Sequence, residues 1–246
     1  MEMENTVSYT QDVSSSKFLA KVFGYMFIGL LISAVVAFGW SFGLAYFCLD
    51  TDGYLTDQGY LIALITGLVC LFGSIIISVV NSLYSAKTGK APWVGFILYA
   101  VFMGGVFSLV LLGGISLSVV AEAFFITALA FGSMFLVGYF SKSNLNWLAL
   151  VASGLGIGLM MTSLFWGIFY LISPAAGLFL DWVISVGVLV VLMIFVAVDS
   201  YNIKKLAENG NNNTNIALFC AFNMYSDFLM VFIRILYLLA ATSKKR

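Results

Sequence analysis

Seven long apolar runs, separated by short connections, determine what this chain of 246 residues can fold into. A helix that crosses a membrane needs about 20 consecutive apolar residues. Each run is long enough, so the sequence predicts an all-α integral membrane protein with seven transmembrane helices. The predicted helices are Phe18–Phe47, Tyr60–Tyr84, Trp93–Leu112, Leu117–Phe140, Leu145–Ile172, Trp182–Ile203 and Asn215–Ala240.

The composition excludes several classes of function. Hydrophobic residues make up 62% of the chain and charged residues only 9%, whereas a soluble domain carries about 25% charge. The net charge is zero, which gives no reason to expect a nucleic-acid partner. Histidine is absent, so the commonest general base and metal ligand are missing. Cys48, Cys70 and Cys220 stand singly, without metal or redox spacing. We therefore expect neither an enzyme nor a bound cofactor.

The chain is expected to form one domain. Residues 1–17 are polar and predict a disordered N-terminal tail, residues 18–243 a single transmembrane domain, and residues 244–246 a basic C-terminal tail. The connections between the runs, such as Ser173–Asp181 and Lys204–Thr214, are short. Each helix should therefore pack antiparallel to its neighbour in sequence.

The distribution of lysine predicts the orientation in the membrane. Cytosolic loops of membrane proteins carry an excess of Lys and Arg. The second, fourth and sixth connections hold Lys, whereas the first, third and fifth hold no Lys or Arg, and Asp occurs in the first and fifth. The amino terminus is therefore expected in the cytosol and the carboxyl terminus outside. The final Lys244–Arg246 opposes this assignment, and a last helix that re-enters without crossing is the alternative. The loop lysines fall in the second, fourth and sixth connections: Lys87, Lys90, Lys142, Lys204 and Lys205.

Small residues at a spacing of four allow helix backbones to approach closely in membranes. The sequence predicts such close approaches at Gly39 with Gly43, Gly154 with Gly158, the Gly104-Gly105 pair, and Gly132.

Four ionisable residues lie inside the predicted spans: Glu122, Asp199, Asp227 and Arg234. Charges in hydrocarbon are costly and normally face a bundle interior, a partner or a water path. Asp227 lies about 18 Å into the last run and Asp199 about 8 Å from the cytosolic end of the sixth, at ~1.5 Å per residue. A helix with both Asp227 and Arg234 should be surrounded by protein.

Asp199 and Asp227 are the candidate switch. Two carboxyl groups brought close together in a low-dielectric setting cannot both ionise easily and titrate as a unit. Because their predicted depths differ by about 10 Å, contact requires helix tilt or a sixth helix set deeper. The alternative for Asp199 is a shallow, hydrated carboxylate tied to Lys204 or to a helix end.

Glu122 has three interpretations: an ion pair with Arg234, a wall of an outer vestibule for cations, or a position at the lipid interface. Asp50, Asp52, Asp57 and Asp181 lie in the predicted outer connections. They could raise the local cation concentration, although solvated loop charge is the simpler account.

Several segments resemble the Bax inhibitor family, also called the lifeguard or transmembrane Bax-inhibitor-motif proteins. Asp199 stands in AVDSYNIKKL and Asp227 in ALFCAFNMYSDFLMVFIRIL, which are similar to the two signature segments of that family. The resemblance extends over nearly the whole chain after residue 17. Further similar segments are KVFGYMFIGL from Lys21, GFILYAVFMGGVFSL from Gly95 and AFFITALAFGSMFLVGYFSKSNLN from Ala123.

The resemblance implies two groups of three helices around a central last helix. It also implies a pH-regulated calcium leak gated by a hydrogen-bonded Asp pair, which Asp199 and Asp227 match. The chain departs from the family pattern at Val198, at Met230, and at Tyr237, where a basic residue is usual and Arg234 is nearest. Lys87 is the nearest match to the family's basic latch.

The sequence therefore favours a bacterial-type inner-membrane protein that passes Ca²⁺ slowly, with Asp199 and Asp227 as gate, proton sensor and transient Ca²⁺ contact. Lys87, Glu122 and Arg234 are candidate latch or pore-lining residues. The expected partners are the lipid bilayer, Ca²⁺ and protons, with membrane protein partners also compatible, and we expect a monomer. The alternatives are a non-conducting membrane regulator of a protease or of a stress or cell-death pathway, and a proton-coupled transporter of a small solute.

Overall fold

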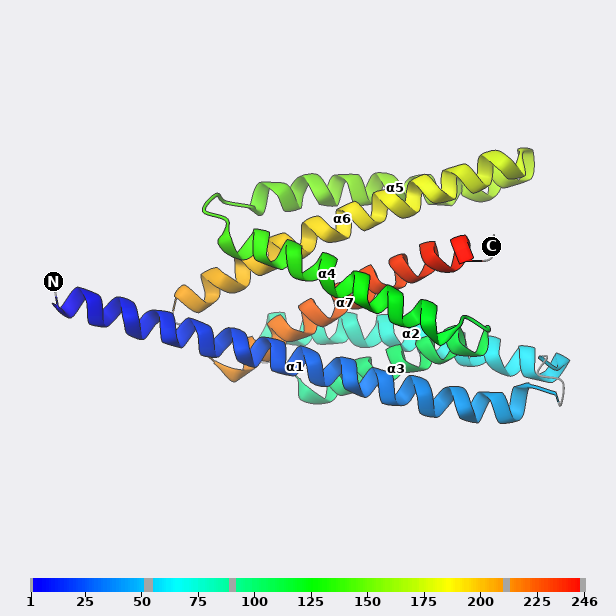
Figure 1. The fold of residues 1–246 in the computed structure, drawn as a ribbon, viewed down its shortest axis with the longest axis horizontal. Coiled ribbons are helices and arrows are strands. Elements are labelled where there is room, and N and C mark those ends of the chain that lie inside the picture. The colour runs from blue at the N-terminus through cyan, green and yellow to red at the C-terminus, as the bar shows by residue number, and fades with distance from the viewer. Residues whose placement is uncertain (1, 51–54, 89–91, 210–212, 244–246) are drawn as a thin grey trace. The chain divides into compact units, whose positions relative to one another are not determined.

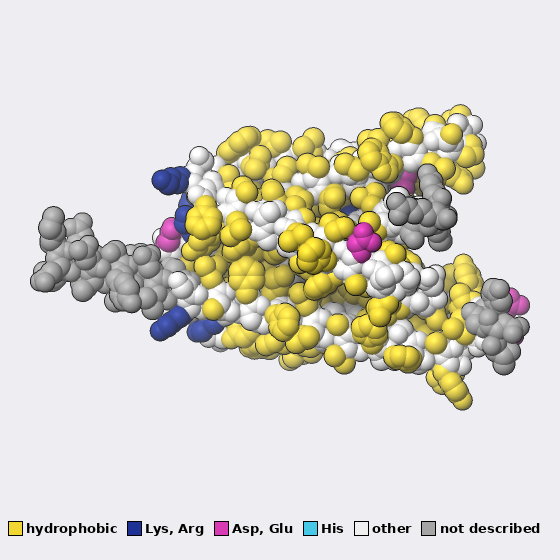
Figure 2. Space-filling model, viewed as in Figure 1, with side chains coloured by type: hydrophobic (Ala, Val, Ile, Leu, Met, Phe, Trp, Pro, Cys, Tyr) yellow, Lys and Arg dark blue, Asp and Glu magenta, His cyan; other side chains and the backbone are white. Residues whose placement is uncertain are grey.

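The computed structural model describes residues 2–50, 55–88, 92–209 and 213–243, which form seven helices and no strand (Figure 1). All seven are long and apolar enough to cross a membrane. Hydrophobic side chains cover the visible helix surfaces (Figure 2), as contact with lipid requires. The chain is an all-α, multi-pass membrane protein. The helices are α1 (Glu2–Cys48), α2 (Asp57–Thr88), α3 (Trp93–Leu112), α4 (Leu117–Phe140), α5 (Asn146–Ile172), α6 (Pro174–Glu208) and α7 (Thr214–Ser243).

The chain divides into two compact units, each with three helices and part of α7. The first unit comprises Met1–Leu117 with Gly210–Tyr225, and the second Ser118–Asn209 with Ser226–Arg246. Of the most apolar stretch of α7, 61% is buried, compared with 6% for α5. The last helix is therefore the one that the others cover, which confirms the expectation from its two charges.

In the first unit, α3 packs against both α1 and α2. A Cβ atom added to Gly104 would lie 2.8 Å from the carbonyl oxygen of Ser33 in α1, and one added to Gly105 would lie 2.5 Å from the sulfur of Cys70 in α2. These contacts confirm the close approach predicted for the Gly104-Gly105 pair. The rings of Phe96, Tyr99 and Tyr225 complete this core edge to face.

A buried hydrogen-bond relay joins three helices of this unit. The Ser33 hydroxyl of α1 donates to the Ala100 carbonyl of α3 at 2.8 Å. The Tyr225 hydroxyl of α7 is in turn hydrogen-bonded to the Ser33 hydroxyl. Tyr225 is fully buried, so its hydroxyl depends on this partner.

In the second unit, α5 and α6 pack along each other (Figure 1). The indole N–H of Trp166 in α5 donates to the carbonyl of Gly177 in α6 at 3.1 Å. The closest backbone approach joins α4 to α6, because a Cβ atom added to Gly138 would lie 2.0 Å from the carbonyl oxygen of Ala197. Gly138 was not among the glycines predicted from the sequence to allow close helix approach.

The close helix approaches predicted for five other glycines do not occur, so those predictions were wrong. A Cβ atom added to any of these glycines would meet no heavy atom within 4 Å. The four-residue spacing identifies a flat helix face, but it does not place a neighbour against that face. The residues concerned are Gly39, Gly43, Gly132, Gly154 and Gly158.

The helix bounds differ from the prediction at several ends, including both ends of α2. α1 continues back to Glu2, where the sequence predicted a disordered tail; residues 2–17 contain no Gly or Pro that would end a helix. α6 begins at Pro174, so most of the predicted connection Ser173–Asp181 is helical. α6 and α7 extend to Glu208 and Ser243. The predicted bounds of α3 and α4 are confirmed. Residues 244–246, the predicted basic tail, lie outside the described residues.

Candidate functional site

The length of α6 sets the depth of Asp199. Ser173 accepts a hydrogen bond from the Ala176 backbone N–H and caps the helix, and Pro174 occupies its first turn, where a missing N–H costs nothing. At the other end the helix continues to Glu208, which places Asp199 nine residues, about 14 Å, from that end. Asp227 lies thirteen residues, about 20 Å, from the start of α7. The difference in depth thus falls from about 10 Å to about 6 Å.

The structure brings Asp199 and Asp227 into side-chain hydrogen-bond contact within the second unit. Two carboxylates have no hydrogen to share, so one of the two groups must carry a proton. Asp227 Oδ2 is buried, and no donor group of the described protein bonds to it. The arrangement can therefore hold and release a proton.

Packing from α4 fixes both sides of this pair. Gly138 contacts the α6 backbone at Ala197, two residues before Asp199. Phe228, which follows Asp227, is buried and packs edge-on against Phe124 and Phe131 of α4, with ring centroids 5.5 and 5.4 Å away. The backbones that carry the two carboxyl groups are thus both held by the same helix.

Lys204 does not neutralise Asp199. Its ammonium group lies 3.9 Å from a carboxylate oxygen of Glu208 and 5.6 Å from the centre of the Tyr139 ring. Lys205 lies 4.6 Å from the centre of the Tyr201 ring. The alternative of a shallow carboxylate tied to Lys204 is therefore wrong, because the lysine is engaged one turn further along the helix.

The other predicted site residues are separate from the pair. Glu122 is exposed on α4 and Arg234 is partly buried on α7, and no ion pair joins these two described side chains. The exposed position favours the lipid-interface interpretation of Glu122. Lys87 is exposed in the last turn of α2, in the first unit.

One polar contact in the second unit was not predicted from the sequence. The Tyr237 hydroxyl of α7 donates to the Asp181 carboxylate of α6, and Arg234 is close enough to influence Tyr237 electrostatically. Asp181 was assigned to a loop. The sequence Ser173-Pro174 is a typical helix start, and it could have placed Asp181 on α6, eighteen residues or five turns from Asp199 and on the same face.

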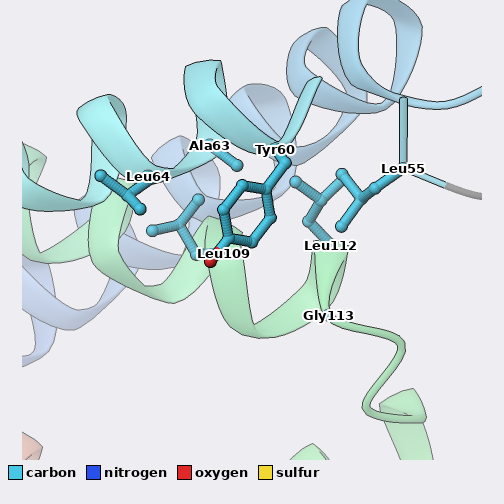
Figure 3. Close-up of a pocket in the computed structure, with 7 residues that line it drawn as sticks. All are labelled: Leu55, Tyr60, Ala63, Leu64, Leu109, Leu112 and Gly113. Carbon is cyan, nitrogen blue, oxygen red and sulfur yellow. The ribbon is translucent and has the colours of Figure 1, made fainter. Parts of the chain in front are cut away.

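A pocket of about 300 Å³ opens between α2 and α3 in the first unit (Figure 3). Tyr60 carries the only titratable group among its described lining residues, and no set of polar side chains converges there. It therefore lacks the groups of an ion or catalytic site. The lining residues are Leu55, Tyr60, Ala63, Leu64, Leu109, Leu112 and Gly113.

No group of three or more His, Cys, Asp or Glu side chains that could hold a metal ion occurs among the described residues. The Asp199–Asp227 pair therefore offers two carboxyl groups to a cation, fewer than a resident Ca²⁺ site, which takes six to eight oxygen ligands.

Comparison with known proteins identifies relatives along almost the full chain. The family model described as "Inhibitor of apoptosis-promoting Bax1" matches residues 15–244. The inner membrane protein YbhL of Escherichia coli is 28% identical over 228 residues, covering 89% of each chain. The uncharacterized protein YrjE of Lactococcus lactis is 26% identical and covers 99% of each chain. An uncharacterized protein of Borreliella burgdorferi is 29% identical, covering 94% of this chain and 93% of its own. No solved structure matches significantly.

Proposed function

Because the chain belongs to the family of inhibitors of apoptosis-promoting Bax1, and because two of its membrane helices bring a pair of carboxyl groups together, we propose that it is a pH-regulated calcium leak channel. The pair Asp199–Asp227 is the gate. Loss or gain of the shared proton alters the attraction between α6 and α7, and this changes how readily Ca²⁺ passes along them.

The observation that carries the proposal is the hydrogen bond between two carboxyl side chains deep in membrane-spanning helices. Charged residues at such depth are costly and typically mark ion or proton pathways. Carboxylate oxygens are the ligands that Ca²⁺ prefers, and Asp227 Oδ2 has no partner within the protein. A passing ion would meet these oxygens without a resident binding site, as a slow leak requires.

Few other charges act on the pair. The α5 helix contains no charged residue, Glu122 of α4 is exposed, and Lys204 is engaged by Glu208. The protonation of Asp199 and Asp227 is therefore coupled mainly to each other. A single shared proton is a simple means of making the passage of Ca²⁺ depend on pH.

The deciding experiment measures Ca²⁺ entry into dye-loaded liposomes across acidic and neutral pH. Wild-type protein should give a flux that depends on pH. In Asp227→Asn the side chain keeps a donor and an acceptor but cannot titrate, so its flux should no longer vary with pH. Asp199→Asn should behave in the same way, since either substitution removes the shared proton.

The matched control is Glu208→Gln, which removes an exposed carboxylate from the same helix as Asp199. It should keep the wild-type pH profile, because an exposed ion pair contributes only about 0.3–0.5 kcal/mol. A wild-type flux no greater than that of protein-free liposomes, with folded protein, would eliminate the channel.

A non-conducting regulator would then be favoured. In that case the Asp pair only holds α6 and α7 together, and Asp227→Asn would lower thermal stability without a flux to lose. The description of the family, an inhibitor of another protein, is compatible with this alternative.

A further inference from the structure

One face of α6 carries Asp181, Ser185 and Asp199. Eighteen residues, or five turns, separate the two Asp residues, and Ser185 lies about 40° from each around the helix axis. Asp181 accepts a hydrogen bond from Tyr237 of α7, and Asp199 contacts Asp227 of α7. This is therefore the face of α6 that meets α7 within the second unit, and Ser185 lies between the two contacts.

Ser185 differs from the other buried hydroxyl residues. Ser185 Oγ is fully buried and has no hydrogen-bond partner. A buried polar group without a partner is destabilising, and it often marks a position that a water or an ion occupies. The other buried serine and threonine hydroxyls donate to backbone carbonyls: Ser33 to Ala100, Ser74 to Leu71, Ser108 to Gly105, Thr127 to Ala123 and Ser200 to Val196.

The second buried oxygen without a partner lies on the same pair of helices. Among the buried side-chain nitrogen and oxygen atoms that the structure describes, Ser185 Oγ and Asp227 Oδ2 alone lack a partner. Both are sealed from solvent. The two oxygens thus belong to the pair of helices that meet at Asp181–Tyr237 and at Asp199–Asp227, and we call the region between these two contacts the seam. Replacing both oxygens with apolar groups would remove the cost of burying them.

The outer end of this seam is held by the Tyr237–Asp181 hydrogen bond. Tyr237 is 46% exposed and Asp181 is partly exposed, so neither is enclosed by the protein. Arg234, one turn further in on α7, acts electrostatically on Tyr237. It forms no ion pair with any described side chain, and an unpaired guanidinium in a membrane span requires water or a counter-ion.

We propose that the Tyr237–Asp181 hydrogen bond is the outer gate of a water-filled passage between α6 and α7. Ser185 and Asp227 Oδ2 line the passage when the gate opens, and the structure is its closed form. Water, or a hydrated cation, then satisfies the two oxygens that have no partner in the closed seam. The inference deepens the proposed function, since it gives the Asp199–Asp227 pair an aqueous route to the outer surface.

The test is the reactivity of Ser185→Cys toward membrane-impermeant methanethiosulfonate reagents, in reconstituted protein whose three native cysteines are replaced by alanine. The thiol should react slowly when the gate is intact. Adding Tyr237→Phe should accelerate the reaction about tenfold or more, because the opening equilibrium loses one hydrogen bond to a charged group. Asp181→Asn, which removes the charge of the acceptor, should also accelerate it.

Thr127→Cys provides the matched control. Thr127 is as fully buried in the same unit, but its hydroxyl is bonded to its own helix, so its thiol should stay protected in every background. Protection of Ser185→Cys in the presence of Tyr237→Phe would overturn the proposal. Equal acceleration at both positions would also overturn it, because that result indicates general loosening.

The charge of Arg234 gives a second readout. Arg234→Gln should raise the rate at which a cationic reagent reacts with Ser185→Cys relative to an anionic reagent of similar size. A ratio of the two rates that Arg234→Gln leaves unchanged would contradict a passage along this charge. Labelling requires no ion conduction. Gated labelling without Ca²⁺ flux would therefore refute the calcium leak and retain the passage, whereas flux without labelling would do the reverse.

Discussion

At the scale of the residue, the environment of a glycine decides its function, and the glycine count does not. Gly138 lies in the last turn of α4 and Gly154 inside α5, both apolar helices of the second unit. A Cβ atom at Gly138 would meet the Ala197 backbone at 2.0 Å, whereas one at Gly154 would meet nothing within 4 Å. Backbone cannot move aside as a flexible side chain can, so the two positions should respond in opposite ways.

We therefore expect Gly138→Ala to lower the free energy of unfolding by about 1–3 kcal/mol, the typical cost of overpacking. Gly154→Ala should be neutral or stabilising by up to ~1 kcal/mol, because alanine favours helix. Thermal unfolding in detergent measures both. Equal melting temperatures for the two variants would show that α4 and α6 are not in backbone contact at Ala197. Gly138→Ala should also alter the pH profile of ion flux, since Asp199 is two residues from that contact.

At the scale of the element, a single relay links α1, α3 and α7 through Ser33, Ala100 and Tyr225. Removing the Ser33 hydroxyl, in the middle of the relay, should lower the free energy of unfolding more than removing the Tyr225 hydroxyl at its end. Tyr225→Phe leaves Ser33 bonded to Ala100, so it should cost about 1 kcal/mol. Ser33→Ala leaves the buried Tyr225 hydroxyl without its partner and should cost about 1–3 kcal/mol. Denaturation of the two variants measures the difference, and a larger loss for Tyr225→Phe would refute the proposed order.

The ends of the elements mark the limit of prediction from sequence. Hydropathy located every span and matched α3 and α4 because breaks such as Pro92 and Gly113-Gly114 bound them. It began α6 eight residues late, since Ser173-Pro174 is a capping signal and not a change in polarity. This error affected the site. Shortening α6 placed Asp199 too near the surface, and it concealed that Asp181 shares the face of Asp199.

The charged residues of the site could be identified from sequence, but most of their contacts could not. Asp199 and Asp227 stood out because ionisable groups are rare in apolar spans. Their meeting depended on helix length and packing, which composition does not give. Ser185 carried no signal at all, because a serine in a membrane helix usually bonds its own backbone, and only the structure distinguishes the exception.

At the scale of the whole molecule, seven spans place the two ends of the chain on opposite sides of the membrane, if every helix crosses. From the loop lysines we expect the amino terminus in the cytosol. A carboxyl-terminal alkaline phosphatase fusion should then be active and a green fluorescent protein fusion dark. The reverse result would mean that the final Lys244–Arg246 dominates the orientation and that the last helix does not cross.

The division of α7 has a consequence for biogenesis. Residues up to Tyr225 belong to the first unit and residues from Ser226 to the second. Both units therefore draw on α7, which the ribosome delivers after the other six helices, and neither can complete its interior before α7 has been made. Until then, Asp199 must remain in the bilayer without Asp227, the carboxyl group that it contacts in the folded protein. A nascent chain that stalls before residue 214 would leave both units incomplete. Quality-control proteases would then have two incompletely folded units to recognise.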